Sequence, residues 1–189
     1  MGLDLGQSQD ATALVIAERT VKEGQAQYQV PHLQRFKLGT SYPDIVSKVA
    51  TILEALPLLR DTTLVVDATG CGKPVLDMFI KANLPCPVRG VLIHGGDIVT
   101  SEGMTSRIPK RDLAAIVSVL MQSRRLKIID SLPDSRVLQH ELLNFKVKID
   151  PLTAHDSYSA WRENQHDDLV LATALAVWVG EYRKRAFAA

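Results

Sequence analysis

Acidic residues stand at places in this chain where apolar residues are expected. Asp4 interrupts the short apolar run GLDLG, and Asp67 ends the apolar run LVVD. A carboxylate in a buried strand is costly unless it is hydrogen-bonded, paired with a cation or bound to a metal ion. A third acidic site, Asp167 with Asp168, opens the apolar run HDDLVLATALA. The chemistry that suits these residues is the binding of a cation by oxygen atoms.

Each of these carboxylates has an ordinary structural explanation when it is taken alone. Asp4 and Asp67 could accept hydrogen bonds from neighbouring turns, and one of Asp167 and Asp168 could be a helix N-cap. Their joint occurrence favours a shared function, because open α/β sheets bind ligands at the edge where their parallel strands end. The helix dipole also keeps an acid in the first turn of a helix ionised. We therefore expect Asp4, Asp67 and Asp168 to converge.

The ligand types in this set predict the metal and the reaction. Carboxylates without cysteine or histidine partners suit hard cations such as Mg²⁺ or Mn²⁺. Two such ions can activate an attacking water and stabilise the leaving oxygen when a phosphodiester is hydrolysed. The acidic residues therefore predict a nuclease site that holds two Mg²⁺ or Mn²⁺ ions.

A phosphate-binding loop is the competing interpretation of the stretch TGCGK. This stretch follows an apolar run and precedes an expected helix, as in a P-loop. The full pattern fails, since Asp67 stands where its first glycine belongs and Pro74 where a magnesium-binding hydroxyl is required. A glycine-rich turn from strand to helix, with Pro74 in the first helical turn, explains the stretch better.

The elements that must position the acidic residues follow from hydrophobic periodicity. The first third alternates with period two and predicts three antiparallel strands, and the rest alternates helices with strands. This order predicts an α/β fold, a ribonuclease H-like mixed sheet of three antiparallel strands followed by parallel αβ units, flanked by helices. The expected strands are 2–6, 11–18, 25–30, 64–67, 88–93, 125–130 and a hairpin of 145–150 with 157–161, and the expected helices are 44–56, 74–82, 109–120, 134–143 and one from about 167.

Size and composition limit the alternatives. The 189 residues are 46% hydrophobic, which suits one domain spanning residues 1–189. Lys and Arg total 22 against 21 for Asp and Glu, so any polyanion site must be local. Two cysteines are too few for a disulfide framework, which suits a reducing cytosol. We find no leader and no apolar run of roughly 20 residues, and we expect a cytoplasmic protein without a membrane partner.

Several stretches resemble, in order and over nearly the whole chain, the nuclease domain of the large terminase subunit of tailed bacteriophages. They are GLDLGQSQDATAL, LVVDATGCGKPVLDMF, IPKRDL, RLKI and HDDLVLATALAVW. The resemblance implies a ribonuclease H-like fold and metal-dependent cutting of concatemeric viral DNA during genome packaging. It implies that Asp4 and Asp67 are metal ligands, with Asp67 bridging both ions. Asp168, four residues before Ala172, matches the acid of the last motif, and Asp167 is an extra carboxylate.

The resemblance also implies partners. Large terminases combine this nuclease with an ATPase motor, whereas this chain has no P-loop and starts almost at its first aspartate. We therefore expect no ATPase motor domain in it, and no ATP hydrolysis. The full-length protein would work with double-stranded DNA, that motor domain, a small terminase subunit and the portal.

Basic residues form local groups that could contact DNA. We expect contacts from Lys110 and Arg111 before a helix, and from Lys146 and Lys148, which would share one face of a strand. Surface solvation explains the strand pair equally well. Aromatic residues make up 5% of the chain, too few for base stacking, so binding independent of DNA sequence is favoured.

Three other functions remain open at this point. The first is another ribonuclease H-like nuclease, such as a Holliday-junction resolvase, which shares the early aspartate. The second is an actin-like or sugar-kinase-like fragment that binds ATP through GLDLGQSQDAT. The third is a remnant without catalysis that serves as a docking module. Metal-dependent DNA cleavage and ATP binding discriminate among them.

Overall fold

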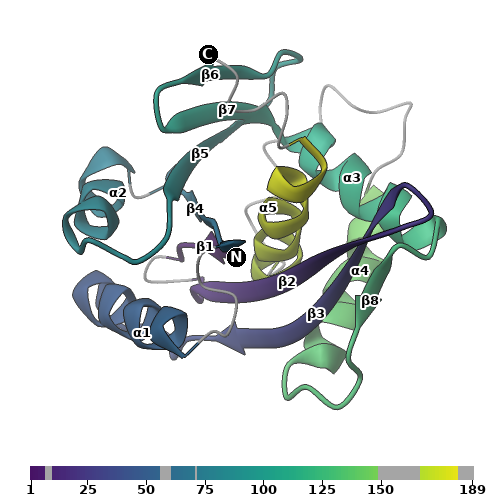
Figure 1. Ribbon diagram of the computed structural model, residues 1–189, viewed down its shortest axis with the longest axis horizontal. Helices are drawn as coiled ribbons and strands as arrows, with labels where there is room; N and C mark the ends of the chain where they lie inside the picture. The colour runs from purple at the N-terminus through teal and green to yellow at the C-terminus, as the bar shows by residue number, and fades with distance from the viewer. Residues whose placement is uncertain (7–9, 56–60, 71, 149–166, 183–189) are drawn as a thin grey trace.

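The computed structural model describes all residues except 7–9, 56–60, 71, 149–166 and 183–189 (Figure 1). In this part of the chain, eight strands form one mixed sheet in the order β6-β7-β5-β4-β1-β2-β3-β8. The strands are β1 (Gly2–Asp4), β2 (Ala13–Lys22), β3 (Gln25–Arg35), β4 (Leu64–Asp67), β5 (Val88–His94), β6 (Thr100–Glu102), β7 (Thr105–Pro109) and β8 (Leu126–Ile128).

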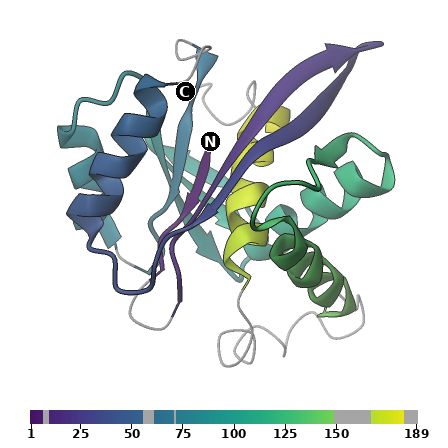
Figure 2. The ribbon, with the colours of Figure 1, turned by 90° about the horizontal axis from the view of Figure 1, so that it is seen from below.

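Helices cover both faces of the sheet (Figures 1 and 2). Helices α1 and α2 lie on one face, and α3, α4 and α5 lie on the other. None of the helices in the described residues is long and apolar enough to cross a membrane. The helices are α1 (Tyr42–Glu54), α2 (Gly72–Lys81), α3 (Lys110–Gln122), α4 (Ser135–Lys148) and α5 (Asp168–Tyr182).

The central strands separate two apolar cores because alternate residues of a strand point to opposite faces. Leu3 of β1, with Leu64 and Val66 of β4, packs with the residues of α1 and α2. Val65 of β4 packs with the residues of α3, α4 and α5. Strand alternation therefore directs Asp4 and Asp67, the last residues of β1 and β4, to the face that α5 covers.

Strand β1 lies directly against helix α5. A Cβ built on Gly2 would lie 2.0 Å from the backbone oxygen of Ala172 and 2.7 Å from the backbone nitrogen of Ala176. Small residues on both elements allow this backbone approach, and Ala172 is fully buried. Since Asp4 follows Gly2 on the same face of β1, and Asp168 precedes Ala172 by one turn of α5, this approach sets the separation of the two carboxylates.

The predicted fold class, an α/β fold with a mixed sheet flanked by helices, is confirmed. Strand β2 pairs antiparallel with both β1 and β3. The pairs β1–β4, β4–β5 and β5–β7 are parallel. Pro109, expected to start a helix, ends β7 and is the N-cap of α3. The hairpin of β6 and β7 was not predicted, because these short segments (TSE and TSRIP) carry little apolar alternation.

One predicted element is wrong. The stretch 145–148, expected as the first strand of a hairpin, is the last turn of helix α4. Leu138, Leu142 and Phe145 are buried at helical spacing, so packing of this stripe prevails over the alternation in FKVK. Residues 149–150 and the partner strand 157–161 lie outside the described residues.

Candidate active site

Asp4 and Asp67 end neighbouring parallel strands, and each residue is only 9% exposed. Leu3 pairs with Val66, so the next residues of the two strands lie side by side. The two side chains are close enough to hydrogen-bond to each other. The structure thus brings the first two predicted site residues together.

A turn fixes the orientation of the Asp67 carboxylate. Its Oδ1 accepts hydrogen bonds from the backbone N–H of Thr69, at 2.8 Å, and from the Thr69 hydroxyl. The Thr69 hydroxyl oxygen in turn accepts from the backbone N–H of Ile93 on β5, at 2.7 Å. The sequence offered hydrogen bonds from a following turn as an ordinary role for Asp67, and these bonds are present. They hold the carboxylate in one orientation where β4 ends.

The first turn of α5 supplies the other acids. Asp168 is buried and its Oδ2 accepts a 2.7 Å hydrogen bond from the Arg35 guanidinium at the end of β3. Asp167 precedes the helix, and its Oδ2 lies 3.8 Å from the Lys110 ammonium. That Oδ2 is buried without a hydrogen bond from any described residue. Two basic side chains thus partly neutralise the acidic end of α5.

The four carboxylates influence one another electrostatically. Burial raises the pKa of Asp4 well above its ordinary value, and the charges of Asp67, Asp168 and Asp167 raise it further. Burial also raises the pKa of Asp67 and of Asp167, while the charge of Lys110 lowers both. Strands β1 and β4 pair with each other and both contact α5, so the elements that carry these acids lie together.

The donor set fits a hard divalent cation, since it contains several buried carboxylate oxygens and one of them lacks a hydrogen bond. The carboxylates are not yet placed as a complete set of metal ligands. Within the described residues, no three Asp, Glu, His or Cys side chains stand close enough together to hold a metal ion as they are. Asp4 and Asp67 form a pair, whereas Asp168 is engaged by Arg35.

Comparisons with known sequences and with solved structures gave different results. No protein-family profile and no curated protein sequence matches the chain. A solved structure, the nuclease domain of the human cytomegalovirus terminase soaked with manganese, superposes with a TM-score of 0.50 at 14% sequence identity. The match covers 94% of this chain and 81% of the viral one. The chain has the fold of a terminase nuclease domain. Likeness at this identity establishes the ribonuclease H-like fold alone.

Sequence reasoning missed several residues around these acids. Arg35, Thr69 and Glu141 carried no signal, because a lone residue at a strand end, in a turn or on a helix does not show its partner. Asp10 was left outside the site, yet its charge contributes to raising the pKa of Asp167. Lys110 was expected to contact DNA, yet it pairs with Asp167.

Two pairs of basic residues were predicted to bind DNA. Lys110 is mostly buried and pairs with Asp167, and the half-exposed Arg111 pairs with Asp97 in the β5–β6 connection. Lys146 and Lys148 lie in α4 rather than in a strand, so the strand alternation that grouped them does not apply. DNA contact by these four residues stays a prediction.

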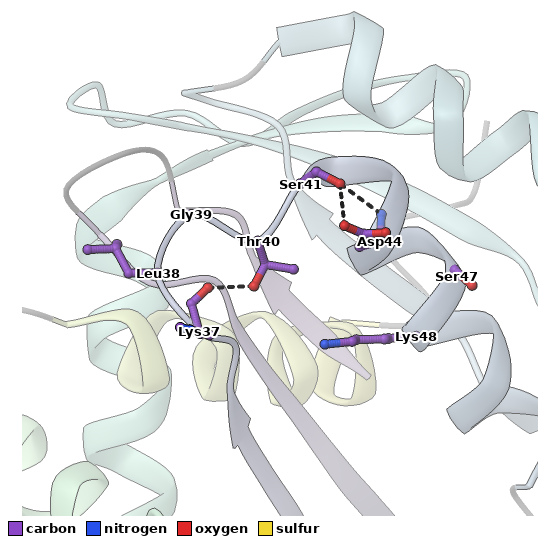
Figure 3. Close-up of a pocket in the computed structure, with 8 residues that line it drawn as sticks. All are labelled: Lys37, Leu38, Gly39, Thr40, Ser41, Asp44, Ser47 and Lys48. Carbon is purple, nitrogen blue, oxygen red and sulfur yellow. Dashed lines mark hydrogen bonds between the residues drawn. The ribbon is translucent and has the colours of Figure 1, made fainter.

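A separate hollow of about 520 Å³ lies where β3 leads into α1 (Figure 3). Strand β3 ends at Arg35, which contacts Asp168, and the lining begins at Lys37. In Figure 3, Lys48 extends from α1 towards the loop 37–40, and its ammonium lies 5.8 Å from the ring centroid of Phe36. The hollow is lined by Lys37, Leu38, Gly39, Thr40, Ser41, Asp44, Ser47 and Lys48.

The buried acids make stability depend on pH. Burial raises the pKa of Asp4, Asp67 and Asp167 above 3.8, and that of Glu141 from 4.5 to about 7. These groups hold more protons in the folded state, so the free energy of unfolding falls as pH rises through this window. We expect the melting temperature in EDTA to fall between about pH 5 and pH 8. A rise over that range would contradict this; added Mn²⁺ should reduce the fall, because a cation favours the ionised acids.

Proposed function

We propose that this chain is a metal-dependent endonuclease that cuts double-stranded DNA. Asp4, Asp67 and Asp168 would hold two Mg²⁺ or Mn²⁺ ions, and Asp167 would assist. The observation that carries the proposal is the convergence of these buried acids at one edge of a sheet with the terminase nuclease fold. A merely structural role would not explain why Asp4 is buried beside the charges of Asp67, Asp168 and Asp167, which raise its pKa after burial itself.

The side chains around the acids have distinct tasks in this proposal. The bound ions would supply Lewis-acid chemistry, activating water and stabilising the leaving oxygen of the phosphodiester. Thr69 keeps the Asp67 carboxylate in one orientation. Arg35 and Lys110 offset the charge of the α5 acids, so a cation would compete with Arg35 for Asp168.

The proposal includes a biological role for the cleavage. We assign the chain to genome packaging in a tailed bacteriophage, where it would cut concatemeric DNA in the host cytoplasm. Its partners would then be an ATPase motor domain, a small terminase subunit and the portal. The bacteriophage origin rests on the motifs GLDLGQSQDATAL, LVVDATGCGKPVLDMF and HDDLVLATALAVW.

The test is incubation of the protein with supercoiled plasmid in Mn²⁺, in Mg²⁺ and in EDTA, beside an ATP-binding measurement. We expect nicked and linear products with either ion, no products in EDTA and no ATP binding. Cleavage in EDTA would refute the metal site. ATP binding without cleavage would favour the actin-like alternative, and preference for a four-way junction over linear duplex would favour a resolvase.

We also expect the hollow beside α1 to contribute to DNA binding. Lys37 and Lys48 line it, and Lys37 stands two residues after Arg35, which contacts Asp168. We expect the backbone of a bound duplex to pass there. The double variant Lys37→Gln/Lys48→Gln should weaken binding of duplexes of any sequence. The affinity should also fall less steeply with salt, the magnitude of the negative slope of log affinity against log salt decreasing by roughly 2. Binding is measured in EDTA over a range of salt concentrations, so that cleavage does not interfere.

The matched control is Lys22→Gln/Lys81→Gln, which removes the same charge from the opposite edge of the sheet. Lys22 ends β2, which runs antiparallel to β1, and Lys81 ends α2; both are exposed. This control should leave the salt slope close to that of the wild type. Equal losses of DNA affinity in the two double variants would mean that the hollow has no special part in binding DNA.

A further inference from the structure

Glu141 of helix α4 caps helix α5, although it lies far from it in the sequence. Its Oε2 accepts hydrogen bonds from the backbone N–H groups of Leu169 and Val170, at 3.0 and 3.1 Å. The first N–H groups of a helix have no partner within the helix, and a side chain close in sequence usually supplies one. Here the partner is a carboxylate that is only 5% exposed, on another helix.

This cap acts on the turn that presents Asp168. Leu169 and Val170 directly follow Asp168, whose carboxylate is held from the other side by Arg35. Arg35 is itself anchored, because its backbone N–H donates to the Asp134 carboxylate at 3.1 Å. Asp168 is thus fixed by two groups, one acting on its backbone turn and one on its side chain.

Stability alone does not account for a carboxylate in this place. The Oε1 of Glu141 is buried without a hydrogen-bond partner among the described residues. A buried carboxylate with one unsatisfied oxygen is costly, and an apolar residue would pack at lower cost. Asp167 stands at the N-cap position of α5, yet the N–H groups of Leu169 and Val170 donate to Glu141.

We propose that Glu141 is a positioning residue that holds the first turn of α5 so that Asp168 faces Asp4 and Asp67. This inference rests on the proposed function, since it concerns the ion-binding role of Asp168. Glu141 itself does not contact DNA or the ions. It acts through the backbone of residues 169 and 170.

Three variants separate positioning from simple stability. Glu141→Gln keeps an oxygen that accepts from both N–H groups, whereas Glu141→Leu removes the acceptor at similar size. Leu138→Ala, one turn earlier on α4, opens a cavity at a fully buried site without touching the cap. It is the control for loss of stability, and melting temperatures of all variants are recorded in EDTA.

The first measurement is Mn²⁺ binding by calorimetry, well below the melting temperature of every variant. For Glu141→Leu we expect the Mn²⁺ dissociation constant to rise roughly 10- to 100-fold, as when a residue that orients a metal ligand is lost. Glu141→Gln should stay within a few-fold of the wild type, and so should Leu138→Ala. Unchanged Mn²⁺ affinity in Glu141→Leu would overturn the proposal.

The second measurement needs no metal ion. The NMR signal of the Arg35 side-chain N–H reports its contact with Asp168. It should move towards the position seen in Asp168→Asn when Glu141 is replaced by leucine, and stay unchanged in Leu138→Ala. An unmoved signal in Glu141→Leu overturns the positioning role. If the signal moves but the wild type binds no Mn²⁺, the proposed function fails while the control of Asp168 by Glu141 stands.

Discussion

Replacing Asp67 by asparagine is expected to abolish metal-dependent cleavage of plasmid DNA while leaving the fold intact. Asparagine keeps the Oδ1 that accepts from Thr69, so the turn after β4 should form normally. It removes the negative charge next to Asp4, which is needed to hold a cation. We expect the cleavage rate in Mn²⁺ to fall roughly 10³-fold, equivalent to about 4 kcal/mol of lost transition-state stabilisation.

The matched control for this variant is Asp77→Asn. Asp77 is an exposed residue of α2, on the face of the sheet opposite to α5. It should cut plasmid at the rate of the wild type. The melting temperature of Asp67→Asn in EDTA should equal or exceed that of the wild type, since one of several repelling charges is gone. Full activity in Asp67→Asn would refute the assignment of the site.

Replacing Gly2 by alanine is expected to destabilise the protein strongly. The added Cβ would overlap the backbone of Ala172 and Ala176, and backbone atoms cannot move aside as a flexible side chain can. We expect the free energy of unfolding to fall by about 3 kcal/mol and the melting temperature by roughly 6 to 12 °C. Denaturant titration and thermal melts measure the two quantities.

Gly2→Ala should also change the position of Asp168 relative to Asp4. Helix α5 must shift away from β1 to admit the new methyl group, and Asp168 then moves relative to Asp4. Mn²⁺ binding should therefore weaken in Gly2→Ala at temperatures where the protein is still folded. The control is Gly95→Ala, where the added Cβ meets nothing within 4 Å. Equal stability of the two variants would contradict the close contact of β1 and α5.

The sequence by itself determined the order of the elements and the places of the acids. Asp4 and Asp67 interrupt apolar runs, and local periodicity identified those runs as strands. Parallel pairing of β1 and β4 then brings the two strand ends together. Asp168 was found for a similar reason, since an acid before a long apolar run is typical of a helix start.

Hydrophobic periodicity did not predict β6 and β7, and it assigned the end of α4 to a strand. The segments of β6 and β7 are short and polar, and only pairing with each other and with β5 makes them strands. Phe145 looked like part of an alternating strand, yet its burial with Leu138 and Leu142 makes it part of α4. The pairing of β7 with β5 and the packing of α4 against α5 are the contacts that the local patterns do not show.

Only the tertiary structure decided how the acids are held. Arg35 reaches Asp168 across 133 positions of sequence, and Glu141 reaches the turn after Asp168 across 28. The physical reason is that residue type and periodicity report the face on which a side chain lies, whereas ion pairs and caps depend on which faces meet. The contact of Gly2 with α5 is of the same kind, because a glycine at a strand end shows nothing of the helix packed against it.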